Sequence, residues 1–123
     1  ANLAGIVAEH DFTLFEYFLT DVAGHREDRE KQAAVVRELE AFFLELAARL
    51  EVLGATLFLT SDHGNLEDNT VRTHTRNRVP CLVLGGDRES RTPFRHEGGP
   101  LESLYHRILQ WFAHQPGSPS ARS

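Results

Sequence analysis

Three short polar strings hold the residues that could do chemistry. They are TDVAGH (residues 20–25), TSDHGN (60–65) and THTR (73–76). Together they supply two carboxylates and three imidazoles, from Asp21, His25, Asp62, His63 and His74. Carboxylate and neutral imidazole are ligands that borderline divalent metals such as Zn²⁺ and Mn²⁺ prefer. The residue types therefore predict a metal centre, or part of one.

The first string has a spacing that suits two ligands of one metal. Asp21 and His25 are four residues apart, and Gly24 lets the backbone turn tightly enough for both side chains to face one point. Taken alone, the pair is weak evidence, because aspartate and histidine are common in loops. Its meaning depends on the other two strings.

The second and third strings strengthen the case. Asp62 and His63 are adjacent, so in an extended segment they would point to opposite sides, but Gly64 permits a bend toward one centre. Two neighbouring metals could also divide the pair. Alternatively, Asp62 caps a turn and His63 is exposed. His74 follows twelve residues after Asp62, shortly before an apolar run. The three strings together are much more specific than any one of them.

Apolar periodicity predicts the elements that position these strings. Three short runs predict strands, at residues 12–19, 55–60 and 79–84. The first two have the composition of strands buried on both faces, as in a parallel sheet. A three- and four-residue apolar repeat predicts a long helix from about Asp28, its N-cap, to about Leu53, with Gly54 as the stop. A last helix is predicted from about Leu101 to His114.

The order of these elements predicts an α/β fold. Strand, helix, strand, loop, strand and helix imply right-handed βαβ crossovers, and hence a three-layer αβα arrangement with a parallel sheet. Groups at the carboxyl ends of parallel strands converge on one edge of the sheet, where open α/β folds place their sites. We expect the three strings to meet at such an edge.

The segments between the elements predict the domain organisation. Residues 21–28 and 61–78 are expected to be loops, and eighteen irregular residues are unusual in a compact domain unless a function such as metal coordination explains them. Residues 1–114 are interpreted as one partial domain, and the Pro/Ser/Gly-rich residues 115–123 as a disordered tail. Residues 3–8 resemble the end of a helix, which suggests a piece of a longer protein.

Composition narrows the possible partners. The 123 residues suffice for one small domain with a core, and a formal net charge of -5 argues against nucleic acid as the main partner. No apolar run approaches the roughly 20 residues that span a bilayer, and no signal peptide is recognisable, so no membrane partner is expected. The single Cys81 fits a reducing compartment, the cytoplasm, and is expected to be a buried structural thiol.

The three strings resemble the metal-binding motifs of the alkaline phosphatase superfamily, in particular of its cofactor-independent phosphoglycerate mutases and phosphopentomutases. TSDHGNLE (60–67) resembles the mutase motif T-A-D-H-G-N-x-E, and DVAGH (21–25) resembles D-x-x-G-H. HTRNRVP (74–80) is similar to the phosphopentomutase motif H-T-R-x-x-x-P. The resemblance covers residues 12–85 and mixes features of two subfamilies. It implies the C-terminal portion of an alkaline phosphatase-like domain.

Carried over position by position, the resemblance implies two divalent metal ions, Mn²⁺ or Zn²⁺. Asp21, His25 and His74 would bind one ion, while Asp62 and His63 would contribute to the second. In this superfamily the metals activate a serine, a threonine or occasionally a modified cysteine that takes the phosphoryl group. The implied substrate of the full-length protein is a phosphorylated small molecule.

Four further polar residues are candidates for supporting the ligands or contacting a phosphate, namely Arg26, Asn65, Glu67 and Arg76. Arg76 is the best candidate for a phosphate contact, because its guanidinium can grip a phosphate with two hydrogen bonds. The alternative for all four is exposed loop polarity. Three other histidines have no partner identified at ligand spacing and are expected at the surface, namely His96, His106 and His114.

The chain departs from the family pattern at the nucleophile. The family supplies an aspartate ligand from its first strand and a nucleophile from an early helix start, both far upstream of the D-x-x-G-H string. Only eleven residues precede the first predicted strand here, and His10 and Asp11 lie too near to play those parts. Thr60 and Ser61 adjoin the ligand pair, which is not where the family's nucleophile lies. We therefore expect the nucleophile to be absent from this chain.

Three hypotheses remain open at this point. The chain is the metal-binding part of a two-metal phosphoryl-transfer enzyme of the phosphomutase or phosphohydrolase type, with a sulfatase less favoured, and is inactive alone. Alternatively, it is a non-catalytic metal-binding or interaction domain, a degenerate relative of the family. In the third hypothesis these residues are loop polars, and metal ions will not raise the melting temperature.

Overall fold

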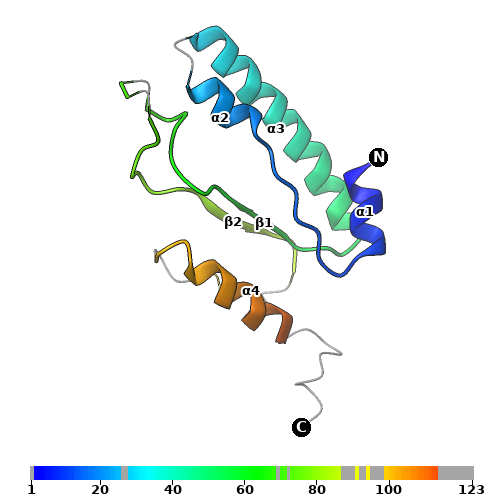
Figure 1. The fold of residues 1–123 in the computed structure, drawn as a ribbon. Coiled ribbons are helices and arrows are strands. Elements are labelled where there is room, and N and C mark those ends of the chain that lie inside the picture. Colours follow the sequence, from blue (N-terminus) through cyan, green and yellow to red (C-terminus); the bar gives the residue numbers. More distant parts are fainter. Residues whose placement is uncertain are drawn as a thin grey trace. The chain divides into compact units, whose positions relative to one another are not determined.

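The computed structural model of this chain describes residues 2–25, 28–68, 70–71, 73–86, 91, 94 and 99–113 (Figure 1). They fall into two compact units, Ala1–Leu84 and Gly85–Ser123. The predicted tail at 115–123 lies outside the described residues. Within the described part of the chain, no helix is both long and apolar enough to cross a membrane.

The first unit combines three helices with a two-stranded sheet (Figure 1). Its elements, in chain order, are α1 (Leu3–Glu9), α2 (Leu19–Gly24), α3 (Arg29–Val52), β1 (Leu57–Thr60) and β2 (Cys81–Leu84). The second unit contains α4 (Ser103–Ala113), which lies within the range predicted for the last helix. The mixture of helices and a small sheet agrees with the α/β class.

Helix α3 confirms the predicted long helix. The prediction succeeded because residues close to each end of the helix determine where it begins and stops. The Asp28 side chain accepts a hydrogen bond from the Lys31 backbone N–H at 3.1 Å, as an N-cap does. At the other end, the Ala55 N–H donates to the Leu50 carbonyl at 2.9 Å across Gly54. Gly54 has a φ of 66°, a left-handed conformation that glycine adopts without steric cost.

The two strands are antiparallel, so the predicted parallel pairing is wrong for them. Leu57 lies opposite Leu84, and Thr60 lies opposite Cys81. Parallel neighbours require a crossover, usually a helix, whereas the chain between β1 and β2 folds back on itself. An isolated bridge between Gly64 and Thr75 closes that return. β1, the loop and β2 therefore form one long hairpin.

The predicted strand at residues 12–19 is also not observed. Residues 12–18 carry neither helix nor strand, and α2 begins at Leu19, the last residue of the predicted strand. The segment runs outstretched beside α3 (Figure 1), and the Phe15 ring lies 5.4 Å from the Phe42 ring of α3. Phe15 thus contacts a helix, and the described residues include no strand that pairs with this segment.

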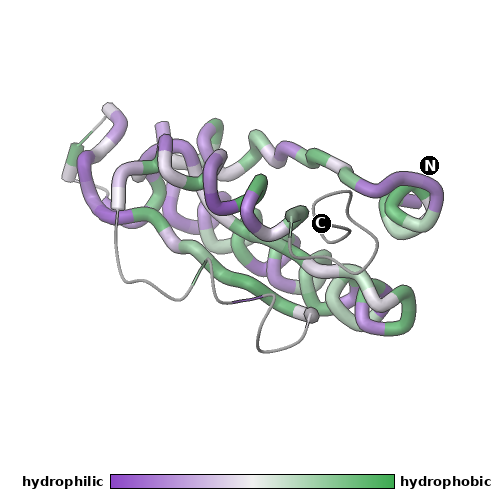
Figure 2. The backbone as a smooth tube through the Cα atoms, turned by 90° about the horizontal axis from the view of Figure 1, so that it is seen from below, coloured by the Kyte–Doolittle hydropathy of each residue, from purple (hydrophilic) through white to green (hydrophobic). Residues whose placement is uncertain are grey.

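The core of the first unit is small, and much apolar surface remains open. Its buried apolar side chains belong to α1 (Ala4), α2 (Ala23) and α3 (Leu46 and Leu50), and both α1 and α2 contact α3. Figure 2 shows hydrophobic residues along both strands. Leu14 and Phe18 remain 74% and 67% exposed in the outstretched segment. The Cys81 thiol is also exposed, because no described element of the first unit covers β2 there. The prediction of a buried thiol is therefore wrong.

Candidate metal centre

The hairpin brings the second and third polar strings to one place. Antiparallel pairing puts the end of β1 beside the start of β2, so the loop between them leaves and returns at one end of the sheet. The Thr75 N–H donates to the Gly64 carbonyl at 2.8 Å and joins the two arms of that loop. As a result, the rings of His63 and His74 stack with centroids 3.5 Å apart and an interplanar angle of 13°.

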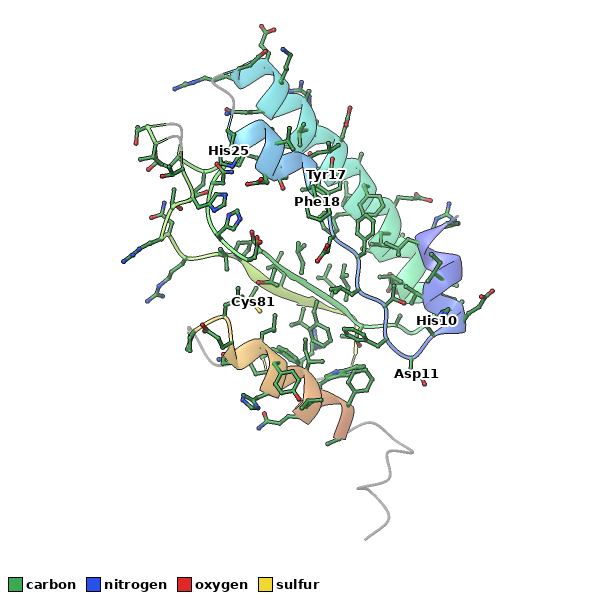
Figure 3. All side chains as sticks on the ribbon, viewed as in Figure 1. His10, Asp11, Tyr17, Phe18, His25 and Cys81 are labelled. Atoms are coloured by element: carbon green, nitrogen blue, oxygen red, sulfur yellow. The ribbon has the colours of Figure 1, made fainter. Side chains whose placement is uncertain are left out.

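The first string is helical rather than a loop, and the helix itself aligns its two candidate ligands. Asp21 lies in α2 and His25 is the C-cap of that helix. Residues four apart share one face of a helix, so no tight glycine turn is needed. Asp21 Oδ1 lies 3.4 Å from His25 Nε2. Figure 3 shows His25 at the end of α2, facing the loop that follows β1.

The strings converge on one carboxylate oxygen. Asp21 Oδ1 also lies 3.4 Å from His74 Nε2, and the His25 and His74 ring centroids are 5.2 Å apart. Ligand atoms of Asp21, His63 and His74 all lie within 4.8 Å of one another. These three residues form the mutually close group, and His25 adjoins it through its contact with Asp21 Oδ1.

Asp62 lies at the rim of this cluster. Its side chain is 81% exposed, and its Oδ2 is 3.5 Å from His63 Nε2. It is therefore within reach of the cluster but faces solvent. In the structure the five predicted residues form one continuous cluster, with Asp62 outermost.

The residues present suit a divalent metal ion. Tetrahedral coordination at about 2.1 Å places neighbouring ligand atoms about 3.4 Å apart, which matches both separations from Asp21 Oδ1. His63 Nδ1 is buried and has no hydrogen-bond partner among the described residues. A buried ring nitrogen normally has a hydrogen-bond partner, and a metal ion bound to this nitrogen would take the place of that partner. One carboxylate with several imidazoles is a donor set for Zn²⁺ or Mn²⁺.

Hydrogen bonding and nearby imidazoles keep Asp21 anionic. The Asn65 hydrogen bond lowers the pKa of the Asp21 carboxyl most. Desolvation opposes it as the second-largest effect, and attraction to His25, His74 and His63 lowers the pKa further. Because metals bind the carboxylate rather than the carboxylic acid, Asp21 is ready to coordinate at neutral pH.

Asn65 contacts a ligand residue directly. It is buried, with 7% of its surface exposed, and its Nδ2 donates to Asp21 Oδ1 at 2.7 Å and to the Asp21 backbone carbonyl at 3.3 Å. The sequence suggested a supporting or phosphate-contacting residue. The geometry shows contact with Asp21.

Glu67 connects the two arms of the loop. Its carboxylate accepts hydrogen bonds from the Asn65 N–H at 2.7 Å, from Asn77 Nδ2 at 3.0 Å and from the Thr75 hydroxyl. The Thr75 bond is the largest of the effects that lower the pKa of Glu67 to about 2. A methyl group on Gly64 would collide with the side chains of Thr75 and Glu67. The loop can therefore close only around this glycine.

The remaining candidates are two arginines and three histidines, of which the structure describes Arg76 and His106. Arg76 is exposed in the returning arm of the loop, and Arg26 lies outside the described residues. His106 is exposed on α4, as expected, whereas His96 and His114 fall outside the described residues.

Three contributors were not singled out from the sequence. Thr75 and Asn77 hold Glu67, and Gln32 of α3 donates from Nε2 to the Ala23 carbonyl at the end of α2, at 3.2 Å. Gln32 had a detectable signal, because it is a polar residue on the apolar stripe that continues to Leu46 and Leu50.

Comparison with known proteins finds relatives that this chain matches over part of their length. One relative is the 2,3-bisphosphoglycerate-independent phosphoglycerate mutase of Dinoroseobacter shibae, which is 33% identical over 91 residues; the match covers 68% of this chain and 18% of the relative. The mutase of the same name from Clostridioides difficile is 29% identical over 106 residues, which cover 80% of this chain and 20% of the relative. The mutase of Mycoplasma pneumoniae is 28% identical over 132 residues, which cover 99% of this chain and 25% of the relative. The chain thus spans about a quarter or less of the length of these relatives. No solved structure matches.

The family assignment rests on a match that covers nearly the whole chain. The model of the metalloenzyme superfamily matches residues 3–115. That range contains every residue of the cluster and all the described helices and strands. The chain belongs to the metalloenzyme superfamily.

Proposed function

We propose that this chain is the metal-binding part of a two-metal phosphoryl-transfer enzyme of the phosphomutase or phosphohydrolase type. The observation that carries the proposal is Asp21 Oδ1, which lies 3.4 Å from both His25 Nε2 and His74 Nε2. Membership of the metalloenzyme superfamily and similarity to phosphoglycerate mutases support the reaction class.

In this proposal the cluster holds two ions, Mn²⁺ or Zn²⁺. Asp21, His25 and His74 bind the first ion, and Asp62 and His63 contribute ligands to the second. When bound, such ions lower the pKa of a hydroxyl nucleophile and stabilise charge on the transferring oxygens. The exposed Asp62 carboxylate leaves one side of the cluster open to further ligands.

The chain's own hydroxyls beside the cluster do not supply the nucleophile in this proposal. Ser61 Oγ donates to the His63 carbonyl at 2.8 Å, so this hydroxyl helps to shape the loop. Thr60 Oγ1 donates to the Ser61 carbonyl at 3.4 Å. The nucleophile and the remaining ligand come from the part of the enzyme that this chain does not contain, and this chain alone has no turnover.

The substrate proposed for the full-length protein is a phosphorylated small molecule, as the names of the mutase relatives suggest. Arg76 is free of the hydrogen-bond network around Glu67 and exposed near the cluster, so its guanidinium is the best placed to contact a phosphate.

A three-layer αβα arrangement with a mainly parallel sheet is proposed for the full-length protein. The support is the unused apolar surface of the first unit: Leu14 and Phe18 are largely exposed, and β1 is only half-buried along its length. Further strands and helices would cover this surface, with residues 12–18 taking part in the larger sheet.

The test is activity of the full-length protein after loading with Mn²⁺ or Zn²⁺. We expect turnover of an aryl phosphate or interconversion of phosphoglycerates, and loss of that turnover in Asp62→Ala. Metal uptake without any turnover would instead identify a non-catalytic metal-binding domain. Absence of metal uptake would reject both functions.

A further inference from the structure

We propose that Asn65 is a positioning residue that holds the Asp21 carboxylate in its metal-binding orientation, and that Gly24 provides the space that Asn65 requires. The inference rests on the proposed function, since it concerns how that metal centre is assembled. It adds two residues whose roles follow from their contacts rather than from ligand chemistry.

Asn65 holds Asp21 through two contacts. One amide nitrogen, Nδ2, reaches both the Asp21 backbone carbonyl and its carboxylate Oδ1. Because backbone and side chain of the same residue are held together, rotation of the carboxylate is restricted. The oxygen so held is the one that lies 3.4 Å from His25 Nε2 and His74 Nε2. Asn65 therefore selects the oxygen that faces the imidazoles.

The contact with the Asp21 carboxylate determines the orientation of the Asn65 amide. Turned over, it would set Asn65 Oδ1 against the Asp21 carboxylate, and two acceptors would repel each other. In the observed orientation Oδ1 is buried without a hydrogen-bond partner among the described residues, which is unfavourable. The hydrogen bonds from Nδ2 to Asp21 offset the cost of leaving Oδ1 unpaired. Asn65 is thus committed to the ligand and has no donor left for a substrate phosphate.

Position 24 has no room for a side chain beside Asn65. A methyl group there would lie 2.5 Å from Cγ and 2.8 Å from Nδ2 of Asn65, closer than real contacts permit. Gly24 does not have a positive φ, so its backbone does not require glycine. The Asn65 backbone is held by Glu67 at 2.7 Å, which prevents an easy retreat of the amide. Any side chain at position 24 would therefore displace the amide from Asp21.

The experiment is calorimetric titration of the 123-residue chain with Mn²⁺, with wild type compared with Asn65→Ala and Gly24→Ala. We expect at least tenfold weaker binding in each variant, the usual effect of removing a group that orients a metal ligand. Gly5→Ala is the matched control. Gly5 is another helical glycine, but its added methyl group meets nothing within 4 Å, so affinity should not change.

The double variant Asn65→Ala with Gly24→Ala separates positioning from general stability. Once the amide is gone, a methyl group at position 24 has nothing to displace. We therefore expect the double variant to bind Mn²⁺ as the Asn65→Ala variant does, rather than more weakly. Losses that multiply in the double variant would overturn the role of Gly24. Thermal melting without metal checks that each protein is folded.

Three outcomes decide between the claims. Wild-type affinity in Asn65→Ala, together with lost binding in Asp21→Asn, would overturn the role of Asn65 and leave the metal centre in place. If Asn65→Ala does not fold, Gly24→Ala against Gly5→Ala decides, because Asn65 is retained in both. No Mn²⁺ binding by the wild-type chain would overturn the metal centre itself, and this inference with it.

Discussion

At the scale of single residues, Asp21 is the point on which the cluster depends. Its Oδ1 is close to two imidazoles and to the Asn65 amide at the same time. The three polar strings were predictable as a set from residue types and spacing. The place of His63 beside His74 was not, because it depends on a loop that folds back through the Gly64–Thr75 bridge.

Replacement of Asp21 tests whether its charge organises the cluster. We expect Asp21→Asn to weaken Mn²⁺ binding at least 100-fold, since a neutral amide replaces the anionic ligand and loses attraction to the imidazoles. Calorimetric titration measures this change. Asp11→Asn makes the same change of charge at an exposed position, which Figure 3 shows far from His25, and should bind like wild type. Equal affinities in both variants would exclude Asp21 as a ligand.

Glu67 makes a pH-dependent contribution to stability. Its pKa is lowered from 4.5 to about 2, so its hydrogen bonds stabilise the fold fully above pH 4.5 and this contribution is lost as the pH falls toward 2. The full shift would correspond to about 3 kcal/mol, but exposure of the carboxylate reduces the expected contribution to about 1 kcal/mol.

Urea unfolding of the metal-free chain measures that contribution. Glu67→Gln should be about 1 kcal/mol less stable than wild type at pH 7 and nearly equal to it near pH 2.5. Glu51→Gln, at an exposed position of α3, is the control and should show little effect at either pH. A deficit of Glu67→Gln that is the same at both pH values would contradict the assignment.

At the scale of elements, local signals were predictable and pairings were not. The ends of α3 follow from Asp28 and Gly54, whose effects act within a few residues. Strand direction depends on which distant segment returns, and here a hairpin replaced the expected crossover. The strings still converge, because an antiparallel hairpin also brings the end of one strand beside the start of the next.

Gln32 links two elements that the cluster needs. It is buried, and its Nε2 donates to the Ala23 carbonyl, so it fixes the end of α2 on α3. We expect Gln32→Ala to lower the free energy of unfolding by about 1–3 kcal/mol, because a buried carbonyl loses its partner. Urea unfolding measures this, with Glu38→Ala on the exposed face of α3 as the control. Equal stabilities of the two variants would show that the link is unimportant.

At the scale of the whole molecule, the chain is similar to only part of each relative. It covers 18–25% of the length of the mutases described above. Composition and apolar repeats predicted an α/β class, which the helices and the small sheet bear out. Residues 12–18 illustrate what sequence could not decide, since an aromatic run forms a strand only where a partner strand is present.

Hydrogen exchange tests the proposed larger sheet. In the 123-residue chain, the amides of residues 12–18 should exchange quickly, because the segment has no strand partner among the described residues. In a full-length protein they should be protected by pairing. Exchange followed by mass spectrometry compares the two, with the amides of α3 as an internal standard that is protected in both. Equally fast exchange of residues 12–18 in both proteins would contradict the proposed arrangement.

The most direct test of the metal centre is a crystal structure of the protein grown with Mn²⁺ or Zn²⁺, with the ions located by anomalous scattering. We expect a peak within about 2.0–2.2 Å of Asp21 Oδ1, His25 Nε2 and His74 Nε2. A second peak beside Asp62 and His63 is expected in the full-length protein. An ion bound elsewhere, or none near Asp21 at saturating metal concentration, would contradict a metal centre at Asp21.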